Sequence, residues 1–410
     1  MKKLLLMFAV VGMLFTACNN EPEHIYDDHS ADLVGTWSCF TENYAEVIII
    51  NADGSAVSYG VEDGEYWENV RGTVVTEGGN ITMTFEDNDN FTGHFDIIPN
   101  QQFSLYENTG ERYIYQYCAN DLSDEIIGMW VCNDGPSDKE TDMVIQTFNE
   151  DGTVTKTGWS VASNEFIVEE ALTYKVVGDL LFHQRPSDMV TEGVAPNFAS
   201  KLTYMPNAIQ FGDMLTNTAF KVVNGEVVKL SMSMLRIKQN LDLNNKNYDY
   251  SNIYVTNVKG EDKEFEFAGQ TLNFSTLDGS VMNKMMKHLL FNVSFADNKI
   301  FYNYYYNGEN LSIPAPIVVD GNKMTIKKSV SNPIFKDIDV WTFQDQDNTQ
   351  MHMYMPVSSF EKFIANTAVE LMAKEGKLDL NDAEAVTAIY DGVANAIETI
   401  NVSFIFKTAK

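Results

Sequence analysis

Histidines and cysteines, the side chains best suited to metal binding and nucleophilic chemistry, are few and scattered in this sequence. No two histidines are separated by three residues, and no two cysteines by two. His-x-x-x-His and Cys-x-x-Cys are spacings that bring zinc ligands together. Any zinc site would therefore have to be assembled entirely by the fold, and we expect neither a metal nor another cofactor. The six histidines are His24, His29, His94, His183, His288 and His352.

Two clusters of acidic and amide side chains have oxygen atoms that could coordinate calcium. One contains Asp345, Asp347 and Asn348, and the other runs from Glu86 to Asn90. Neither continues into a loop with glycine at position six and glutamate at position twelve, as an EF-hand requires. Solvated acidic turns are the simpler interpretation. The sequence also lacks a Gly-x-Ser-x-Gly elbow and a phosphate-binding glycine loop, so we expect no enzyme.

A run of tyrosines between residues 301 and 308 is the most unusual aromatic segment. On a strand, Tyr302, Tyr304 and Tyr306 would share one face, because side chains alternate. An exposed row could contact sugar rings or a protein partner, since each tyrosine offers a flat apolar body and a polar tip. The alternative is packing within a barrel wall, which the sequence favours.

The first 18 residues have the layout of a bacterial export signal. Two lysines are followed by an apolar run from Leu4 to Phe15 and by small residues before Cys18. The run is shorter than the roughly 20 residues that span a membrane. The segment from Leu14 to Cys18 resembles the lipobox of bacterial lipoproteins, with Phe15 where leucine is commoner. The resemblance implies cleavage before Cys18 and acylation of that cysteine, which would hold the chain to a membrane.

An acidic, weakly apolar stretch follows Cys18 and predicts a flexible tether. Acidic residues soon after the lipidated cysteine resemble the surface-export signal of Bacteroidetes lipoproteins. This resemblance implies a lipid-anchored protein of the cell outer membrane, displayed on the outer leaflet. An ordinary secretory signal that happens to contain cysteine is the alternative.

Acidic residues outnumber basic ones by 58 to 28, which gives a formal net charge of −30. Such a field makes nucleic acid and bare anionic lipid surfaces poor partners. The hydrophobic content of 44% is still sufficient for substantial cores. The length predicts two or three domains.

One pattern occurs twice. It consists of an apolar pair followed by Gly-x-Trp-x-Cys. The Gly-x-Trp-x-Cys part runs from Gly35 to Cys39 and again from Gly128 to Cys132. Each copy is followed by a strand, an Asn-x-Asp-Gly turn and a second strand. Asp-Gly favours two-residue hairpin turns, in which both central residues have positive φ. The short strands and polar turns around both copies indicate an antiparallel barrel or sandwich.

This repeat resembles the lipocalin-like domains common in Bacteroidetes lipoproteins, over roughly residues 32 to 243. In lipocalins the tryptophan closes one end of the barrel, often beneath an arginine from the last strand. The resemblance implies that Trp37 and Trp130 close the two barrels and that Arg112 and Arg236 stack on them. It supports the fold better than any ligand.

The remainder of the chain predicts further strands, then helices at 358–374 and 380–399, and a closing strand at 401–406. Ser358 or Ser359 could cap the first helix, and Asn381 with Glu384 has capping-box spacing for the second. This segment is similar to uncharacterised lipoprotein domains with a helical insert before the last barrel strand. The expected fold is thus mainly β: tandem antiparallel lipocalin-like barrels, the last with a two-helix insert before its final strand. The expected parts are a signal peptide at 1–17, an acidic tether at 18–31, repeats at 32–120 and 121–243, and a modified barrel at 248–410.

Three cysteines remain once Cys18 is assigned to the lipid. If the first barrel closes, its first and last strands are neighbours, which favours a Cys39–Cys118 disulfide in an oxidising compartment. Three buried thiols are an equal alternative.

Two functions fit these features. The first is a lipid-anchored binding module that holds a small apolar ligand or docks an envelope protein. The second is a structural or adhesin-like surface protein with filled barrels. An open cavity would favour the first, because eight-stranded barrels leave room for at most one small ligand.

Overall fold

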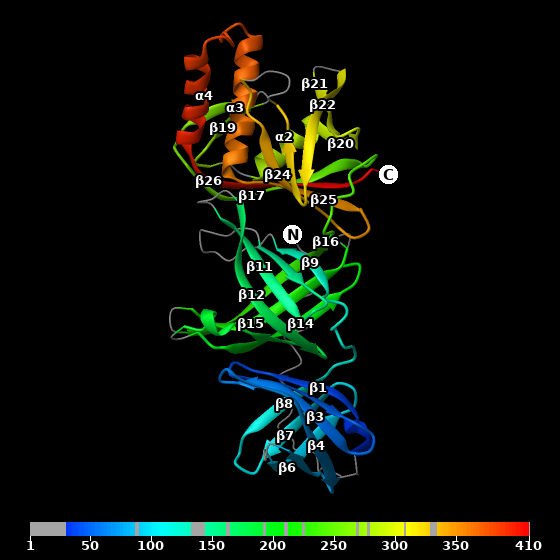
Figure 1. Cartoon of the computed structure of the whole chain (residues 1–410). Coiled ribbons are helices and arrows are strands. Elements are labelled where there is room, and N and C mark those ends of the chain that lie inside the picture. The colour runs from blue at the N-terminus through cyan, green and yellow to red at the C-terminus, as the bar shows by residue number, and fades with distance from the viewer. Residues whose placement is uncertain are drawn as a thin grey trace, which may run out of the picture. The chain divides into compact units, whose positions relative to one another are not determined.

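The computed structural model describes residues 30–409, except 87–89, 133–143, 161–164, 192–193, 209–211, 224–225, 268–269, 277–278, 307–308 and 329–333 (Figure 1). The signal peptide, the tether and Cys18 lie outside these residues. The chain forms two compact units. Of the described residues, the first contains 30–60 and Trp67–Ala119, and the second contains Val61–Tyr66 and 120–409.

Three closed antiparallel barrels of eight strands make up the structure, so the predicted fold class is confirmed. Barrel 1 begins after a short 3₁₀ helix, Ser30–Leu33, and closes where β1 pairs with β8. Its strands are β1 (Gly35–Phe40), β2 (Tyr44–Ile50), β3 (Ser55–Glu62), β4 (Glu65–Glu77), β5 (Asn80–Phe85), β6 (Asn90–Ile98), β7 (Gln102–Glu107) and β8 (Arg112–Tyr117).

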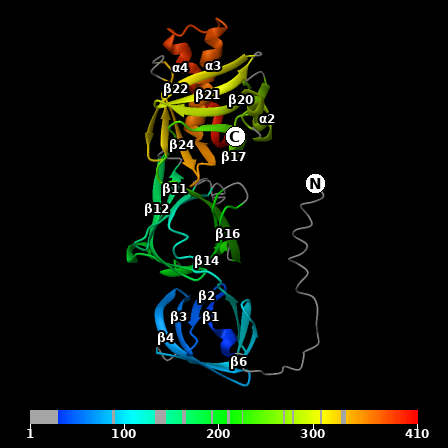
Figure 2. The ribbon, with the colours of Figure 1, turned by 90° about the vertical axis from the view of Figure 1, so that its right-hand side faces the viewer.

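Barrel 2 repeats this up-and-down order and closes where β16 pairs with β9 (Figure 2). A 3₁₀ turn, Ser187–Met189, follows β13. The strands are β9 (Gly128–Cys132), β10 (Val144–Phe148), β11 (Thr153–Ser160), β12 (Glu165–Val177), β13 (Leu180–Gln184), β14 (Asn197–Met205), β15 (Met214–Val223) and β16 (Glu226–Ile237).

The Asn-x-Asp-Gly turns of the two repeats have matching geometry. Asp53 accepts a hydrogen bond from the backbone of Ser55 at 3.0 Å, and Asp151 accepts one from Thr153 at 2.9 Å. Gly54 has a φ of 79°. The aspartates do not share this positive φ, so the expected two-residue turn is wrong. The turn spans four residues and its glycine alone takes the left-handed conformation, which glycine adopts without steric cost.

Barrel 3 closes where β17 pairs with β26. Strands β18 and β19 form a separate two-stranded sheet, which together with α2 separates β17 from β20. Two helices precede β26 (Figure 1). The strands and helices are β17 (Asn247–Gly260), β18 (Glu264–Phe267), β19 (Gln270–Asn273), α2 (Gly279–Leu289), β20 (Leu290–Ala296), β21 (Lys299–Tyr306), β22 (Glu309–Asp320), β23 (Lys323–Ile326), β24 (Ile338–Gln344), β25 (Gln350–Met355), α3 (Val357–Lys374), α4 (Ala383–Ala396) and β26 (Ile397–Thr408).

The helix caps differ in detail from the sequence expectation. Asp382, rather than Asn381, caps α4, and its side chain accepts a hydrogen bond from the Ala385 backbone at 3.0 Å. Asn381 instead donates to Asp379. Asp382 therefore occupies the position at which a side-chain oxygen can reach the free amides of the first turn.

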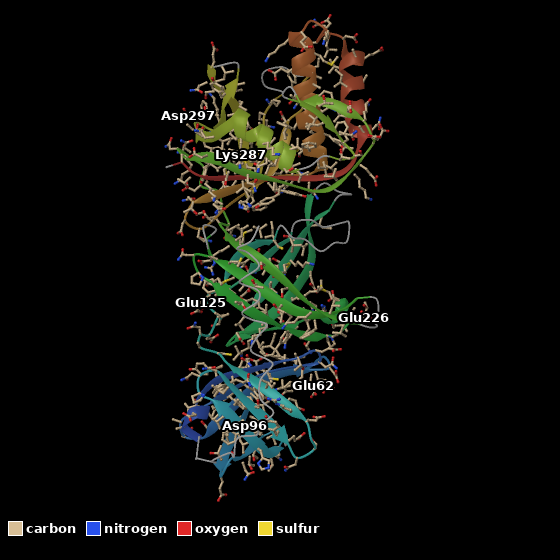
Figure 3. The ribbon with its side chains drawn as sticks, turned by 180° about the vertical axis from the view of Figure 1, so that it is seen from behind. Glu62, Asp96, Glu125, Glu226, Lys287 and Asp297 are labelled. Atoms are coloured by element: carbon tan, nitrogen blue, oxygen red, sulfur yellow. The ribbon has the colours of Figure 1, made fainter. Side chains whose placement is uncertain are left out.

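Acidic side chains are spread over the surface of the protein. Glu62, Asp96, Glu226 and Asp297 are all exposed (Figure 3). This distribution agrees with the large negative net charge and with an acidic field around the protein.

The expected Cys39–Cys118 disulfide is not formed. The described cysteines, Cys39, Cys118 and Cys132, are all buried and none is disulfide-bonded. The backbone of Cys118 donates to the carbonyl of Thr36, three residues before Cys39. Three residues along a strand, at about 3.3 Å each, correspond to about 10 Å. This distance exceeds the separation of about 7 Å between Cα atoms that a disulfide can bridge.

We predict that alkylation of the chain from Asn19 onward modifies these three cysteines only after denaturation. Burial excludes the reagent from the folded protein, and mass spectrometry before and after reduction would show three modified thiols in both cases. Modification of a single cysteine in the unreduced, denatured chain would contradict this and indicate a disulfide.

Candidate functional site in the second barrel

A buried tryptophan closes one end of barrel 1 and one end of barrel 2. Trp37 and Trp130 are both fully buried. Each indole N–H donates to a carbonyl four residues earlier, Leu33 and Ile126 respectively, at 2.7 Å in both cases. The 3₁₀ turn or loop before each first strand is thus tied to the base of its barrel. We refer to this as the closed end.

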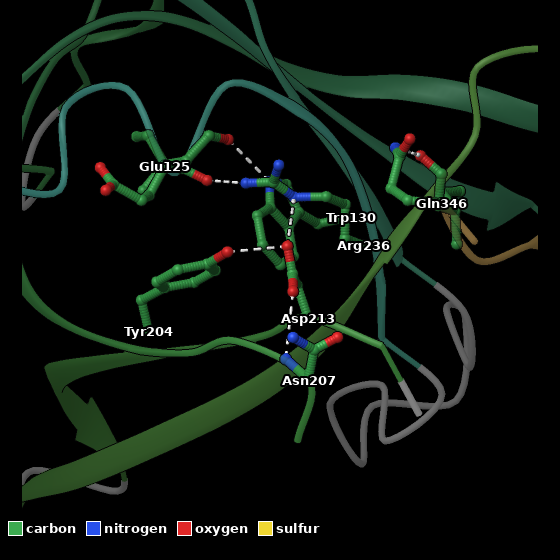
Figure 4. Close-up of polar contacts among 9 residues, drawn as sticks. Glu125, Trp130, Tyr204, Asn207, Asp213, Arg236 and Gln346 are labelled. Carbon is green, nitrogen blue, oxygen red and sulfur yellow. Dashed lines mark hydrogen bonds and ion pairs between the residues drawn. The ribbon is translucent and has the colours of Figure 1, made fainter. Parts of the chain in front are cut away.

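Arg236 lies over Trp130 in barrel 2 (Figure 4). Its guanidinium carbon is 4.7 Å from the ring centroid, a distance suited to a cation–π contact. Arg236 also donates to the Glu125 carbonyl and forms an ion pair with Asp213 at 3.6 Å. The hydroxyl of Tyr204 donates to the same carboxylate at 2.7 Å. This is the arrangement that the lipocalin resemblance implies for Arg236.

Arg112 does not take the corresponding place in barrel 1, which corrects the sequence expectation. Its guanidinium lies 5.1 Å from the ring of Tyr106. Trp37 pairs in register with Tyr117, as Trp130 pairs with Arg236. Tyr117 packs edge-on against Trp37 at 5.1 Å. Arg112 is at the other end of β8, about 16 Å from this position at roughly 3.3 Å per residue.

A glycine makes room for Tyr117. A Cβ on Gly35 would come within 2.7 Å of the tyrosine ring, and the φ of Gly35 is 146°. The first residue of the Gly-x-Trp motif therefore allows the close contact that a larger residue would prevent.

The interior of barrel 1 contains a carboxylate, Glu46, whose hydrogen-bond donors are side chains of the same barrel. Glu46 is buried and accepts hydrogen bonds from the hydroxyls of Tyr44, Tyr115 and Ser58. Burial, together with the nearby Glu46 charge, raises the pKa of Tyr44 and Tyr115 well above the usual value. These groups satisfy each other, as buried polar groups must.

The tyrosine run of barrel 3 does not form an exposed contact face at Tyr302. Tyr302 pairs with the fully buried Val293 and packs against the barrel core, and burial raises its pKa. Tyr305, on the alternate face, is exposed. The side chains of Tyr304 and Tyr306 lie outside what the structure describes. The alternative interpretation, packing in the wall, therefore applies to Tyr302.

Barrel 2 contains a cavity of about 420 Å³. Every strand of the barrel except β9 contributes apolar or polar groups to its walls. It reaches the surface beside Leu230, which lines it and is exposed. The lining residues are Val144, Gln146, Val154, Lys156, Glu170, Leu172, His183, Arg185, Phe198, Ser200, Asn217, Ala219, Leu230, Ser231 and Met232.

Four polar atoms in these walls are buried without a hydrogen-bond partner among the described residues. The polar ring, as we call their residues, comprises Gln146, His183, Ser200 and Asn217. His183 and Ser200 are almost fully buried, with 6% and 1% exposure. An unsatisfied buried polar group costs about 1–3 kcal/mol, so such groups usually indicate water, an ion or a ligand.

The polar ring comes from β10, β13, β14 and β15, and the inward side chains of these four strands form three layers. Phe148, Leu181, Leu202 and Leu215 are buried at the closed end. The polar ring lies two residues farther along each strand, because alternate residues face the same side. The next inward positions are Val144, Arg185, Phe198 and Ala219, which also line the cavity. The polar ring therefore lies at the inner end of the cavity.

Charged groups lie near the third layer. Arg185 pairs with Glu170 at 3.2 Å and donates to the Ala195 carbonyl at 2.7 Å. Its guanidinium lies 4.2 Å from the ring of Phe198, and His183 stacks on the same ring at 4.4 Å. Burial, and secondarily the Arg185 charge, lowers the pKa of His183 to about 3, so the imidazole is neutral at neutral pH.

Register shows that barrel 1 lacks this ring. Counting paired residues from each tryptophan gives the positions in barrel 1 that are equivalent to the four members of the polar ring. They are Ile48, Met83, Gly93 and Leu105. Three of these are buried hydrophobic residues. The sequence does carry a signal, because Gln146, Ser200 and Asn217 each interrupt an otherwise apolar alternation of inward residues. That signal can be recognised only once the two repeats are in register.

Two further features are missing from the part of the chain that the structure describes. Its residues contain no group of three or more His, Cys, Asp or Glu side chains arranged to hold a metal ion. None of its helices is long and apolar enough to cross a membrane.

Comparisons with known proteins give structural likeness only. No protein-family model and no curated protein matches the sequence. A double mutant of transferrin-binding protein B from Haemophilus parasuis aligns with 10% identity and a TM-score of 0.24, and the same protein from Neisseria meningitidis with 8% and 0.21. Both alignments cover 90% of this chain, which spans 66% of each of those chains.

A porin-like protein from Bacteroides uniformis aligns with 8% identity and a TM-score of 0.14, covering 49% of this chain and 94% of that one. At these scores none of the likenesses carries a functional argument. The geometry of the barrel 2 cavity therefore weighs more than any of them.

We predict that Arg236→Met destabilises barrel 2 by about 1–3 kcal/mol, because it removes the stack on Trp130 and leaves the partly buried Asp213 without its cation. Arg112→Met is the matched control and should change the free energy of unfolding by about 0.5 kcal/mol or less. Urea unfolding of both variants tests this. Equal effects would show that Arg236 does not hold the closed end.

We predict that the stability of the unliganded protein falls as pH decreases from about 6.5, because unfolded His183 binds a proton that the folded side chain excludes until about pH 3. The slope from one fully buried histidine is about 1.4 kcal/mol per pH unit. Between pH 6.5 and 5, His183→Gln should reduce the slope below that of the unmodified protein. An unchanged slope in His183→Gln would contradict the prediction.

Proposed function

We propose that this chain is a lipid-anchored envelope protein whose second barrel binds a small organic molecule. The cavity of about 420 Å³ with its polar ring is the observation that supports this proposal. Its volume lies within the range of about 300–1,000 Å³ typical of small-molecule sites, and its mixture of apolar walls with a few convergent polar groups is also typical.

The cost of the unpartnered groups supports binding over imperfect packing. A barrel interior filled with apolar residues would stabilise the fold more than one that leaves four polar atoms unsatisfied. Barrel 1 shows that this scaffold accommodates Ile48, Met83 and Leu105 at three of the four positions. A stability cost without benefit to folding is what a functional site commonly imposes.

Binding, rather than catalysis, agrees with the state of the titratable groups in the cavity. The Glu170 carboxylate is paired with Arg185, and the lowered pKa of His183 keeps the imidazole uncharged. A general acid–base catalyst works best with a pKa near the operating pH. His183 is far from that condition.

The anchor and location are proposed from the sequence. The signal layout, the lipobox-like segment ending at Cys18 and the acidic tether support acylation of Cys18 and attachment to the outer membrane, with surface display. Membership of the lipocalin-like group of Bacteroidetes lipoproteins is part of the same proposal. The clusters of buried hydrophobic residues inside barrels 1 and 3 favour a structural or docking role for those two barrels.

We predict that the chain from Asn19 onward binds N-phenyl-1-naphthylamine, an uncharged fluorescent probe, at one site. Ala219→Trp, which fills the cavity, should weaken binding at least tenfold. Thr218→Trp is the control, because Thr218 is the neighbour of Ala219 on β15 but does not line the cavity. Fluorescence titration measures both. Failure of the unmodified chain to bind, or equal losses in both variants, would refute the proposal.

A further inference from the structure

We infer that barrel 2 binds an amphiphile with an uncharged, hydroxyl-rich head, and that the head enters first. This inference rests on the proposed function and specifies the ligand of the same site. It differs from the small apolar ligand expected from the sequence, because the inner end of the cavity is polar.

The hydrogen-bonding capacity of the polar ring defines the head. Gln146 Oε1 and Asn217 Oδ1 are unpartnered acceptors, so each calls for a donor on the ligand. The Ser200 hydroxyl can donate or accept, and neutral His183 Nδ1 can do either according to its tautomer. Hydroxyl groups fit all four, because a hydroxyl both donates and accepts.

The positions of these groups require several hydroxyls on one compact head. In the closed order of barrel 2, β10 is four strands from β14, and therefore on the opposite wall. Gln146 comes from β10, while His183, Ser200 and Asn217 come from the adjacent strands β13, β14 and β15. A head that satisfies both walls must present donors on two sides, as a sugar ring or glycerol does.

The hydrogen-bonding groups of the cavity disfavour a quaternary ammonium head. Such a head has no N–H or O–H group, so it would leave the acceptors of Gln146 and Asn217 without donors.

Apolar side chains around the open end favour a tail that points outward. The C-terminal ends of β11, β13 and β15 and the N-terminal ends of β12, β14 and β16 all lie at this end, opposite Trp130. Exposed apolar residues occur near these strand ends: Ile167, Val168, Val194, Val227 and Leu230. Exposed apolar groups that gather beside a cavity commonly mark a binding surface.

The test compares three eight-carbon probes below their micelle concentrations by displacement of N-phenyl-1-naphthylamine. We expect octyl β-D-glucoside to bind at least tenfold more tightly than 1-octanol, and octyltrimethylammonium to bind most weakly. Equal displacement by the glucoside and octanol, with the fluorescent probe still binding, would overturn the head assignment and leave the proposed function intact. Failure of the fluorescent probe itself to bind would instead overturn the proposed function.

Variants of the polar ring separate binding from folding. Gln146→Ile with Asn217→Leu should weaken glucoside binding by about 25-fold, near fivefold for each lost hydrogen bond, and should leave octanol binding unchanged or stronger. Ser200→Ala should raise the melting temperature of the unliganded protein while weakening glucoside binding, because it removes an unsatisfied buried hydroxyl. Loss of both probes in the double variant, or a lower melting temperature in Ser200→Ala, would show that these residues serve packing alone.

Discussion

The width of a closed eight-stranded sheet is the constraint on which the rest of this structure depends. Such a barrel is only wide enough for its own inward side chains or for one small ligand. Whether it is solid or hollow is therefore decided by a few inward residues. In barrel 1, large residues such as Phe103 and Tyr115 stack within the interior at 4.6 Å, and in barrel 2 the inward positions include Ser200 and Ala219. One backbone plan thus gives two interiors of different character.

Much of the architecture could be predicted from local sequence patterns. The Gly-x-Trp repeat with its downstream turns indicated tandem antiparallel barrels, and the structure has them. The two C-terminal helices were also evident from their periodicity, although the second is capped by Asp382. These features depend on residues close together in the chain, where periodicity and turn chemistry act directly.

The interior contacts could not be predicted in the same way, because they depend on register between strands that are distant in sequence. Arg112 is late in its repeat, like Arg236, yet the register with Trp37 places Tyr117 over the tryptophan. The disulfide expectation failed for a similar reason, since Cys118 lies opposite Thr36. A shift of a few residues along a strand moves a side chain by about 10 Å or more, which no composition-based argument detects.

Each barrel closes by pairing its first strand with its last, and this determines the order in which the chain can fold. In barrel 3, β17 depends on β26 for most of its hydrogen-bonded partners, and more than a hundred residues, including three helices, separate the two. Contacts between distant segments form slowly, because the entropy of closing the intervening loop is lost before the contacts compensate for it. Barrel 1, made first and closed over a shorter loop, can finish folding while β17 still has an exposed edge. Such an edge is prone to pair with another chain, so the slow step of folding is also the one most open to aggregation.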